Sequence, residues 1–255
     1  MIFAGIDIGS ITAKSALIKN KQVIDTHVIP TGYNPAAASE SVFKYVLNKA
    51  GLKPSDITRI VATGYGRNNV AFADKAMTEI ICHGIGAHFL NPDIRGIIDV
   101  GGQDSKAILL DAAGQVTNFA MNDKCAAGTG RFLEVMARAL EVDLDLLGAI
   151  GLDAKTPAKI SSICTVFAES EVISMIAKQK KRADIIAGIH ESAAARIAVL
   201  AKKIRIKPPV MMTGGVAKNK GMAAALETRL KTTVICQEHA QENGAIGAAV
   251  LASKL

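Results

Sequence analysis

One pattern occurs twice in this chain, as IFAGIDIGSITAKSALI at residues 2–18 and as GIIDVGGQDSKAILL at residues 96–110. In each copy, an apolar run ends in an aspartate and a glycine turn, and a second apolar run carries a lysine. The two copies share one register, in which Asp7 aligns with Asp99. Such internal repetition predicts two halves built on the same template.

Each copy begins a meander that leads into helical sequence. Apolar, β-branched runs in the first half predict three strands, at residues 2–8, 12–18 and 22–29. A helix should follow, because Asn34 is a good N-cap, Pro35 suits the first helical position and Gly51 suits the end. In the second half, apolar periodicity predicts a long helix over 184–204 with Asp184 as its N-cap. Mixed sheets with covering helices predict two α/β lobes, with a ligand cleft between them.

Length and composition narrow the class of protein. We expect a first lobe at residues 1–75 and 240–255, and a second at residues 76–239. No apolar run reaches the roughly 18 residues of a membrane span. The net charge of +7 comes without basic runs interleaved with aromatic residues, so a solvated basic surface is a better interpretation than nucleic-acid binding. Four widely spaced cysteines and no signal-peptide pattern predict a cytoplasmic protein.

The two Asp-x-Gly turns are candidate phosphate-binding loops. Their backbone amides can hold phosphate oxygens, and Asp7 and Asp99 can hold a hydrated Mg²⁺. One such turn is weak evidence, but this one is duplicated and is followed by TGG at 213–215 and ENGAIGAA at 242–249. Gln103 and Asp104 are the polar candidates to position an attacking water, with turn capping as the alternative.

The lysines of the repeat, Lys14 and Lys106, occupy matched positions in the second strand of each meander. Their side chains could reach a phosphate. The alternative is an ordinary solvated strand lysine, which is the commoner case.

These motifs resemble those of the actin, sugar-kinase and heat-shock-chaperone ATPase superfamily. The resemblance implies a duplicated two-lobe actin-like (ribonuclease H-like) fold that binds ATP or ADP in its cleft. It makes GIDIGS (5–10) and IDVGGQD (98–104) the phosphate loops, and MTGGVAKN (212–219) the adenosine loop. The cofactor-binding residues that it implies are Asp7, Gly9, Ser10, Thr12, Lys14, Asp99, Gly101, Gly102, Gln103, Gly128, Thr129, Gly130, Gly214, Gly215, Asn219, Asn243 and Gly244.

Two cysteines precede amphipathic segments. Cys125 stands before AAGTGRFLEVMARALE, and Cys164 stands before TVFAESEVISMIAK. We expect both at helix N-termini, where free amides and the helix dipole favour the metal-binding thiolate. One cysteine so placed is most often a small buried residue, but two are harder to explain that way. Cys82 and Cys236 fit small core residues.

The spacing of Cys125 and Cys164 fits no zinc-finger pattern, and two thiolates cannot complete a 4Fe-4S cluster, which normally needs four. A symmetric homodimer would supply four, two from each copy, around one shared cluster. We therefore expect one 4Fe-4S cluster per dimer.

The segments NDKCAAGTGRFLE, CTVFAESEVIS, DIIAGIH and VMMTGGVAKN resemble the activators (component A, the initiator of dehydration) of 2-hydroxyacyl-CoA dehydratases. They resemble the ATPase subunits of benzoyl-CoA reductase more distantly. The resemblance covers essentially the whole chain. It implies an anaerobic, ATP-dependent electron donor that ferredoxin or flavodoxin reduces and that passes one electron to a dehydratase.

Other functions share parts of this pattern. A sugar kinase would use the same phosphate and adenosine loops, but it would leave the two cysteines without a role. A chaperone-like or filament-like nucleotide switch would hold no cluster. A ring-reductase ATPase subunit would keep the cluster but would normally divide the work between unlike subunits.

Overall fold

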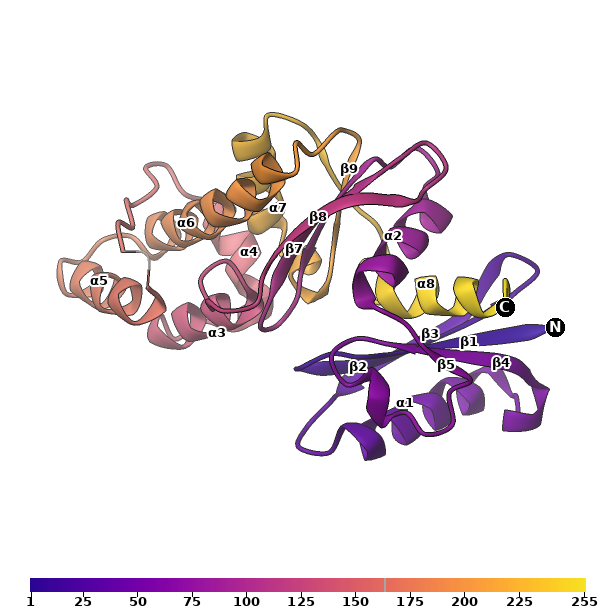
Figure 1. Ribbon diagram of the computed structural model, residues 1–255. Coiled ribbons are helices and arrows are strands. Elements are labelled where there is room, and N and C mark those ends of the chain that lie inside the picture. Colours follow the sequence, from indigo (N-terminus) through magenta and orange to yellow (C-terminus); the bar gives the residue numbers. More distant parts are fainter. Residues whose placement is uncertain (163) are drawn as a thin grey trace. The chain divides into compact units, whose positions relative to one another are not determined.

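The computed structural model describes residues 1–162 and 164–255, which divide into two compact units (Figure 1). The first unit comprises Met1–Ile94, Leu110–Thr117 and Gln241–Leu255, and the second comprises Arg95–Leu109 and Asn118–Ala240. This division by packing differs from the sequence-based boundary at residues 76–94, which lie in the first unit.

The first unit is built on a mixed five-stranded sheet. Its strands are β1 (Ile2–Ile8), β2 (Thr12–Lys19), β3 (Gln22–Pro30), β4 (Ile57–Thr63) and β5 (Lys75–Ala76), in the order β3-β2-β1-β4-β5. The strands β1, β2 and β3 pair antiparallel, as the predicted meander requires, and β4 pairs parallel to β1. The meander predicted from the sequence is therefore confirmed.

Helices cover both faces of this sheet. They are α1 (Pro35–Ala50), α2 (Glu79–Leu90) and α8 (Asn243–Ala252), with short 3-10 turns η1 (Pro54–Asp56) and η2 (Arg67–Asn69). Because side chains alternate along a strand, Ala4 and Ile6 of β1 pack in the core under α1, whereas Phe3 packs in a second cluster with α8. The predicted caps of α1 are present: Asn34 accepts from the backbone N of Ala37, and Gly51 is left-handed.

Helix α8 lies against its neighbours at two glycines. A Cβ at Gly5 of β1 would lie 1.9 Å from the backbone O of Ala245. A Cβ at Gly247 of α8 would lie 1.8 Å from the backbone O of Cys82 in α2. Neither position has room for any side chain, so these glycines set how closely α8 approaches β1 and α2.

The second unit repeats the strand pattern of the first. Its strands are β6 (Gly96–Val100), β7 (Ser105–Leu110), β8 (Val116–Asn122), β9 (Val210–Thr213) and β10 (Val234–Cys236), in the order β10-β9-β6-β7-β8. As in the first unit, the opening hairpin is antiparallel and a later strand, β9, pairs parallel to the first strand, β6. The predicted duplicated α/β fold is therefore confirmed.

Helices of the second unit share one large core with its sheet. They are α3 (Gly130–Ala139), α4 (Leu144–Leu152), α5 (Thr165–Ala177), α6 (Arg182–Lys203) and α7 (Lys220–Leu230), with the 3-10 turn η3 (Gly215–Lys218). Phe132 of α3, Val172 of α5 and Ile189 of α6 are buried in that core. Within the described residues, no helix is long and apolar enough to cross a membrane.

Two features of the second unit correct the sequence analysis. The long helix α6 begins at Arg182 with Lys181 as its N-cap, so Asp184 is not the cap but lies in the first turn. The helix α4 was not predicted, because it is short and its apolar residues show little periodicity. The first error concerns the exact start of a helix, which local pattern determines poorly, and the second concerns the existence of a short helix.

Replacing Gly247 with alanine is expected to destabilise the first unit. The added Cβ would meet the backbone of Cys82, which cannot rotate away, and such overpacking costs about 3 kcal/mol. Urea denaturation would measure the change in the free energy of unfolding. The control Ser253→Ala removes only a hydrogen bond to the backbone O of Val250 and should cost about 1 kcal/mol or less. Equal losses in the two variants would contradict this account of the contact.

Candidate functional site

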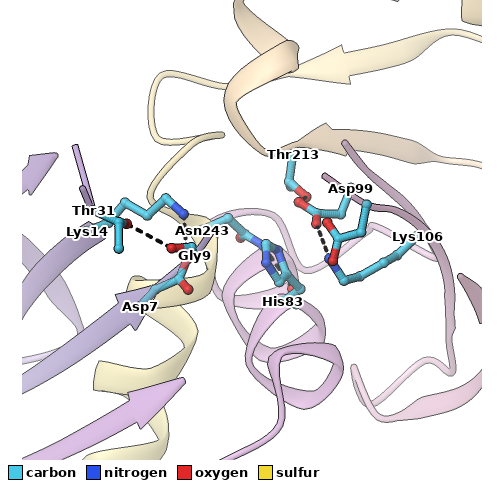
Figure 2. A network of polar contacts seen from close by, with 10 residues as sticks. Asp7, Gly9, Lys14, Thr31, His83, Asp99, Lys106, Thr213 and Asn243 are labelled. Carbon is cyan, nitrogen blue, oxygen red and sulfur yellow. Dashed lines mark hydrogen bonds and ion pairs between the residues drawn. The ribbon is translucent and has the colours of Figure 1, made fainter. Parts of the chain in front are cut away.

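A lysine–aspartate pair lies beside the glycine turn of each unit. Asp7 on β1 lies directly opposite Lys14 on β2, and Asp99 on β6 lies opposite Lys106 on β7. The distance from Nζ to Oδ2 is 3.1 Å in both pairs, which Figure 2 shows as dashed lines. The side chain of Lys106 is only 2% exposed and that of Lys14 only 13%. The alternative of solvated strand lysines is therefore wrong.

The turn of the first unit is held by backbone and hydroxyl contacts. The backbone N of Gly9 donates to the O of Thr12 at 3.1 Å, and the Thr31 hydroxyl donates to the O of Gly9 at 2.8 Å. Ser10 lies at the tip, partly exposed. Of the predicted residues here, Gly9 and Thr12 thus shape the turn through their backbones, and Ser10 is accessible to a ligand.

The Asp7 carboxylate lies against bare backbone in the same unit. A Cβ at Gly64 would lie 2.4 Å from its Oδ1, and a Cβ at Gly244 would lie 3.0 Å from its Oδ2. Next to Gly244, the Asn243 amide donates to the backbone O of His83 at 3.0 Å. The structure therefore brings Asp7, Asn243 and Gly244 close together, and their role in binding a cofactor stays a prediction. Sequence analysis missed the roles of Gly64 and His83; the position of Gly64 directly after a strand was the available signal.

In the second unit, Asp99 is more fully engaged than Asp7. Its Oδ1 accepts from the Thr213 hydroxyl at 2.9 Å. Lys106 also forms an ion pair with Asp104, at 2.7 Å, and the backbone O of Asp104 accepts from the N of Gly101 at 3.0 Å. Asp104, one of the two candidates to position water, is thus anchored within the turn.

Backbone hydrogen bonds tie this turn to the start of α3. The N of Gly130 donates to the O of Gly101 at 2.9 Å, and the N of Arg131 donates to the O of Gly102 at 2.8 Å. Thr129 is the buried N-cap residue of α3, and its hydroxyl bonds the backbone of the preceding loop. Predicted residues from two distant motifs therefore meet at one place in the second unit.

The loop after β9 completes this group. Gly214 has a φ of +86°, and a Cβ there would lie 2.3 Å from the backbone O of Val100. Gly215 begins the 3-10 turn η3 that follows. The side chain of Gln103, the other candidate to position water, is exposed beside the turn. It is therefore more accessible than that of Asp104.

Asn219, predicted in the adenosine loop, has a structural role as well. Its Oδ1 caps α7 by accepting from the N of Met222 at 2.9 Å, and its Nδ2 lies 3.2 Å from Nε2 of His190. Burial lowers the pKa of His190 to about 4, so its ring is neutral at pH 7. A neutral Nε2 accepts the hydrogen bond from the amide. Sequence analysis missed His190, which lies inside the apolar stripe of α6.

The two predicted cluster cysteines both lie in the second unit, as exposed free thiols. Cys164 is the N-cap residue of α5, as predicted. Cys125 is not at a helix N-terminus: α3 begins at Gly130, and a loop including the left-handed Gly128 separates them. The Asn122 side chain holds that loop by bonding both the N and the O of Cys125.

The other cysteines divide differently from the prediction. Cys82 is fully buried, and burial raises the pKa of its thiol to about 12, so it is a core residue as expected. Cys236 is exposed at the end of β10, which corrects its assignment to the core. Among the described residues, no group of three or more histidine, cysteine, aspartate or glutamate side chains could hold a metal within one copy of the chain.

The repeated ion pairs make a matched test of burial. Lys106→Met would leave the buried Asp99 carboxylate and the partly exposed Asp104 carboxylate without their lysine, and breaking a buried pair costs about 3 kcal/mol. Lys14→Met leaves one carboxylate, Asp7, without its lysine, and it should cost less than Lys106→Met because the lysine is more exposed and has one ion-pair partner rather than two. Urea denaturation of both variants measures the difference. An equal loss would show that burial does not distinguish the two pairs.

His190 is expected to make stability depend on pH. In the unfolded chain, His190 is protonated below its ordinary pKa of about 6.5. In the folded chain, it stays neutral down to about pH 4. Stability should therefore fall from pH 6.5 toward pH 4, by up to about 1.4 kcal/mol per pH unit. Denaturation at pH 7 and pH 5 should show this slope in the wild type and in His27→Gln, and a smaller one in His190→Gln. The same slope in all three proteins would refute the assignment.

The chain is similar to dehydratase activators along its whole length. It is 48% identical to the "Activator of lactoyl-CoA dehydratase" of Anaerotignum propionicum, over 99% of this chain and 97% of the relative. The crystal structure of component A of the Acidaminococcus fermentans (R)-2-hydroxyglutaryl-CoA dehydratase covers 100% of this chain and 98% of its own, with a TM-score of 0.97 and 45% identity.

A second solved relative contains a nucleotide analogue. The activator of the 2-hydroxyisocaproyl-CoA dehydratase from Clostridium difficile, solved with bound ADPNP, has a TM-score of 0.95 at 45% identity and covers 100% of this chain and 95% of its own. At the level of fold alone, a Thermus thermophilus ROK hexokinase is also similar, with a TM-score of 0.54 at 15% identity. The model of the BadF/BadG/BcrA/BcrD ATPase family matches residues 4–252, and this chain belongs to that family.

Proposed function

We propose that this chain is the ATP-dependent activator of a 2-hydroxyacyl-CoA dehydratase and delivers one electron to that partner. The observation that carries the proposal is the pair of exposed free thiols, Cys125 and Cys164, on the unit that also holds the Asp99 turn. A sugar kinase would need the turn but not the thiols. The names of three full-length relatives, each an activator or component A of such a dehydratase, support the proposal.

The glycine turns would bind the phosphates of ATP. Gly9 and Gly101 have no side chain that would block the approach of a phosphate to the backbone of the turn. Lys14 and Lys106 supply positive charge beside the turns. Asp7 and Asp99 each already accept a hydrogen bond from a lysine. Each would therefore bind Mg²⁺ through the water molecules that surround the ion. The relative with bound ADPNP supports a nucleotide site in this family.

Water for hydrolysis would be oriented by Gln103. Its amide can both donate to and accept from a water molecule, and its side chain is exposed beside the turn. Asp104 forms an ion pair with Lys106 and a backbone bond to Gly101. We therefore assign Asp104 to shaping the turn rather than to binding the water.

The thiols fit a cluster shared by two copies of the chain. Cys164 is the N-cap residue of α5, and its own side chain makes no capping hydrogen bond, so the N-terminus of this helix would favour an anionic group. Val166 and Phe167, directly after Cys164, are 65% and 66% exposed, as expected for a surface that a second copy covers. Four thiolates from a homodimer would hold one 4Fe-4S cluster, which stores a single electron.

The remaining parts of the proposal concern partners and location. A ferredoxin or flavodoxin would reduce the cluster, under anaerobic conditions and in the cytoplasm. The relatives' names refer to three different acyl-CoA substrates, lactoyl, 2-hydroxyglutaryl and 2-hydroxyisocaproyl. The acyl group is thus a property of the partner dehydratase, whereas the activator supplies the electron.

Anaerobic purification followed by iron and sulfide analysis tests the proposal. We expect about four irons per two chains, as the chemistry of four thiolates requires, and loss of the iron in both Cys125→Ala and Cys164→Ala. Cys236→Ala, which removes another exposed thiol, is the matched control and should retain the iron. ATP hydrolysis should persist in all three variants.

Two results would overturn this function. If the protein hydrolyses ATP but stays free of iron after anaerobic reconstitution, the function is that of a kinase or a nucleotide switch. A protein that holds the cluster but supports only reduction of an aromatic acyl-CoA would indicate a ring-reductase subunit.

A further inference from the structure

Residues 153–162 lie shortly before Cys164 in the chain. They form neither helix nor strand, so their backbone groups need partners elsewhere. Two carboxylates accept hydrogen bonds from three of the backbone N–H groups, those of Lys155, Thr156 and Ser161. One comes from α6 and the other from α5, the helix that begins after Cys164.

Asp184 of α6 anchors the first part of the segment. Its Oδ1 accepts from the backbone N of Lys155 and of Thr156, each at 3.0 Å, and its Oδ2 accepts from the Thr156 hydroxyl at 3.2 Å. Its backbone O also accepts from the N of Ala158 at 2.8 Å. The chain is therefore fixed to α6 well before it reaches Cys164.

Glu171 of α5 anchors the last part. Its Oε2 accepts from the backbone N of Ser161 at 2.8 Å, and its Oε1 accepts from the hydroxyls of Ser161 and of Ser162, the latter at 2.8 Å. These donors, with the Ser161 hydroxyl foremost, lower the pKa of the Glu171 carboxyl to about 2, so it is ionised at neutral pH. Hydrogen bonds to an ionised acceptor are about twice as strong as neutral ones.

The position of Glu171 in the chain gives these bonds a particular effect. Its backbone belongs to the helix that follows Cys164, while its carboxylate holds the two serines that precede Cys164. The contacts thus close a loop whose two ends lie on either side of the cysteine. Such a closure limits the directions in which the Cys164 thiol can point relative to α5.

We propose that Glu171 is a positioning residue for Cys164, which fixes the approach of the chain so that this thiol is held ready to ligate the shared cluster. The inference rests on the proposed function, since it assigns Cys164 as a ligand. Residues behind the ligands commonly orient them and tune the bound group. Glu171 would do so through the backbone and hydroxyls of Ser161 and Ser162 rather than by touching the cluster.

The first measurement uses the full chain without a cluster. Hydrogen–deuterium exchange of the peptide that contains Ser161 and Ser162 should be about tenfold faster in Glu171→Gln than in the wild type, because an amide nitrogen replaces one acceptor. Glu169→Gln, a neighbouring glutamate on the same helix, is the matched control and should exchange like the wild type. If Glu171→Gln does not fold, the double variant Ser161→Ala with Ser162→Ala removes the two hydroxyl donors instead.

The second measurement asks whether the contacts matter to the cluster. In anaerobically reconstituted dimers, the rate of iron loss to a chelator should rise about tenfold in Glu171→Gln or in the double serine variant. The midpoint potential of the cluster, followed by electron paramagnetic resonance, should become more positive, because a looser site is wetter and water stabilises the more highly charged reduced state. Glu169→Gln should match the wild type in both.

The outcomes separate this inference from the function on which it rests. Faster exchange with unchanged iron loss and potential would overturn the inference, since Glu171 would then be structural only. Unchanged exchange would also overturn it. A wild-type protein that binds no iron, or a Cys164→Ala variant that keeps all of it, would instead refute the proposed function, and the exchange data would stand as a description of the loop.

Discussion

The cross-strand pair of lysine and aspartate is the contact on which each half of the chain depends. Asp7 and Lys14, like Asp99 and Lys106, lie opposite each other in the register of an antiparallel hairpin. A slip of one residue between the two strands would put the lysine and the aspartate on opposite faces of the sheet, so this register is required to pair two otherwise buried charges. The glycine turn that joins the two strands is thereby held in place in each unit.

Glycines on neighbouring segments leave the space that the two Asp-x-Gly turns occupy. In the first unit, Gly64 and Gly244 leave room for the Asp7 carboxylate, and in the second, Gly214 lies against the backbone beside Asp99. A Cβ at Gly64 or Gly244 would crowd the Asp7 carboxylate, and one at Gly214 would meet the backbone O of Val100. These glycines, of which the sequence analysis singled out Gly214 and Gly244, are therefore part of the construction of the candidate phosphate sites.

Local signals were enough to predict the parts of the fold that local physics determines. The apolar, β-branched runs of β1 to β3, the Asn34 cap and the left-handed Gly51 depend on neighbours in the sequence, and all were predictable. The neighbouring sequence gives Asp184 the pattern of a helix N-cap. Its carboxylate instead accepts hydrogen bonds from a loop nearly thirty residues away, including one from the backbone N of Thr156. The hydrogen bond between Asn219 and His190 is equally distant in sequence. No local pattern encodes such contacts, which arise only when the core of the second unit closes.

The two copies of the template have diverged in a way that suits the chemistry proposed for the second unit. In the second unit, Lys106 forms an ion pair with a second carboxylate, that of Asp104. The backbone of Gly101 and Gly102 also accepts hydrogen bonds from the first residues of α3. Helix α3 in turn contacts α5, the helix that begins after Cys164, within one continuous core. Close-packed interiors do not deform smoothly, and backbone bonds tie the turn to the start of α3, so we expect a displacement of the turn to move the start of α3. The candidate phosphate turn and the thiol-bearing helix are thus parts of one mechanical unit, which a nucleotide-dependent electron donor requires and a simple phosphate-binding domain does not.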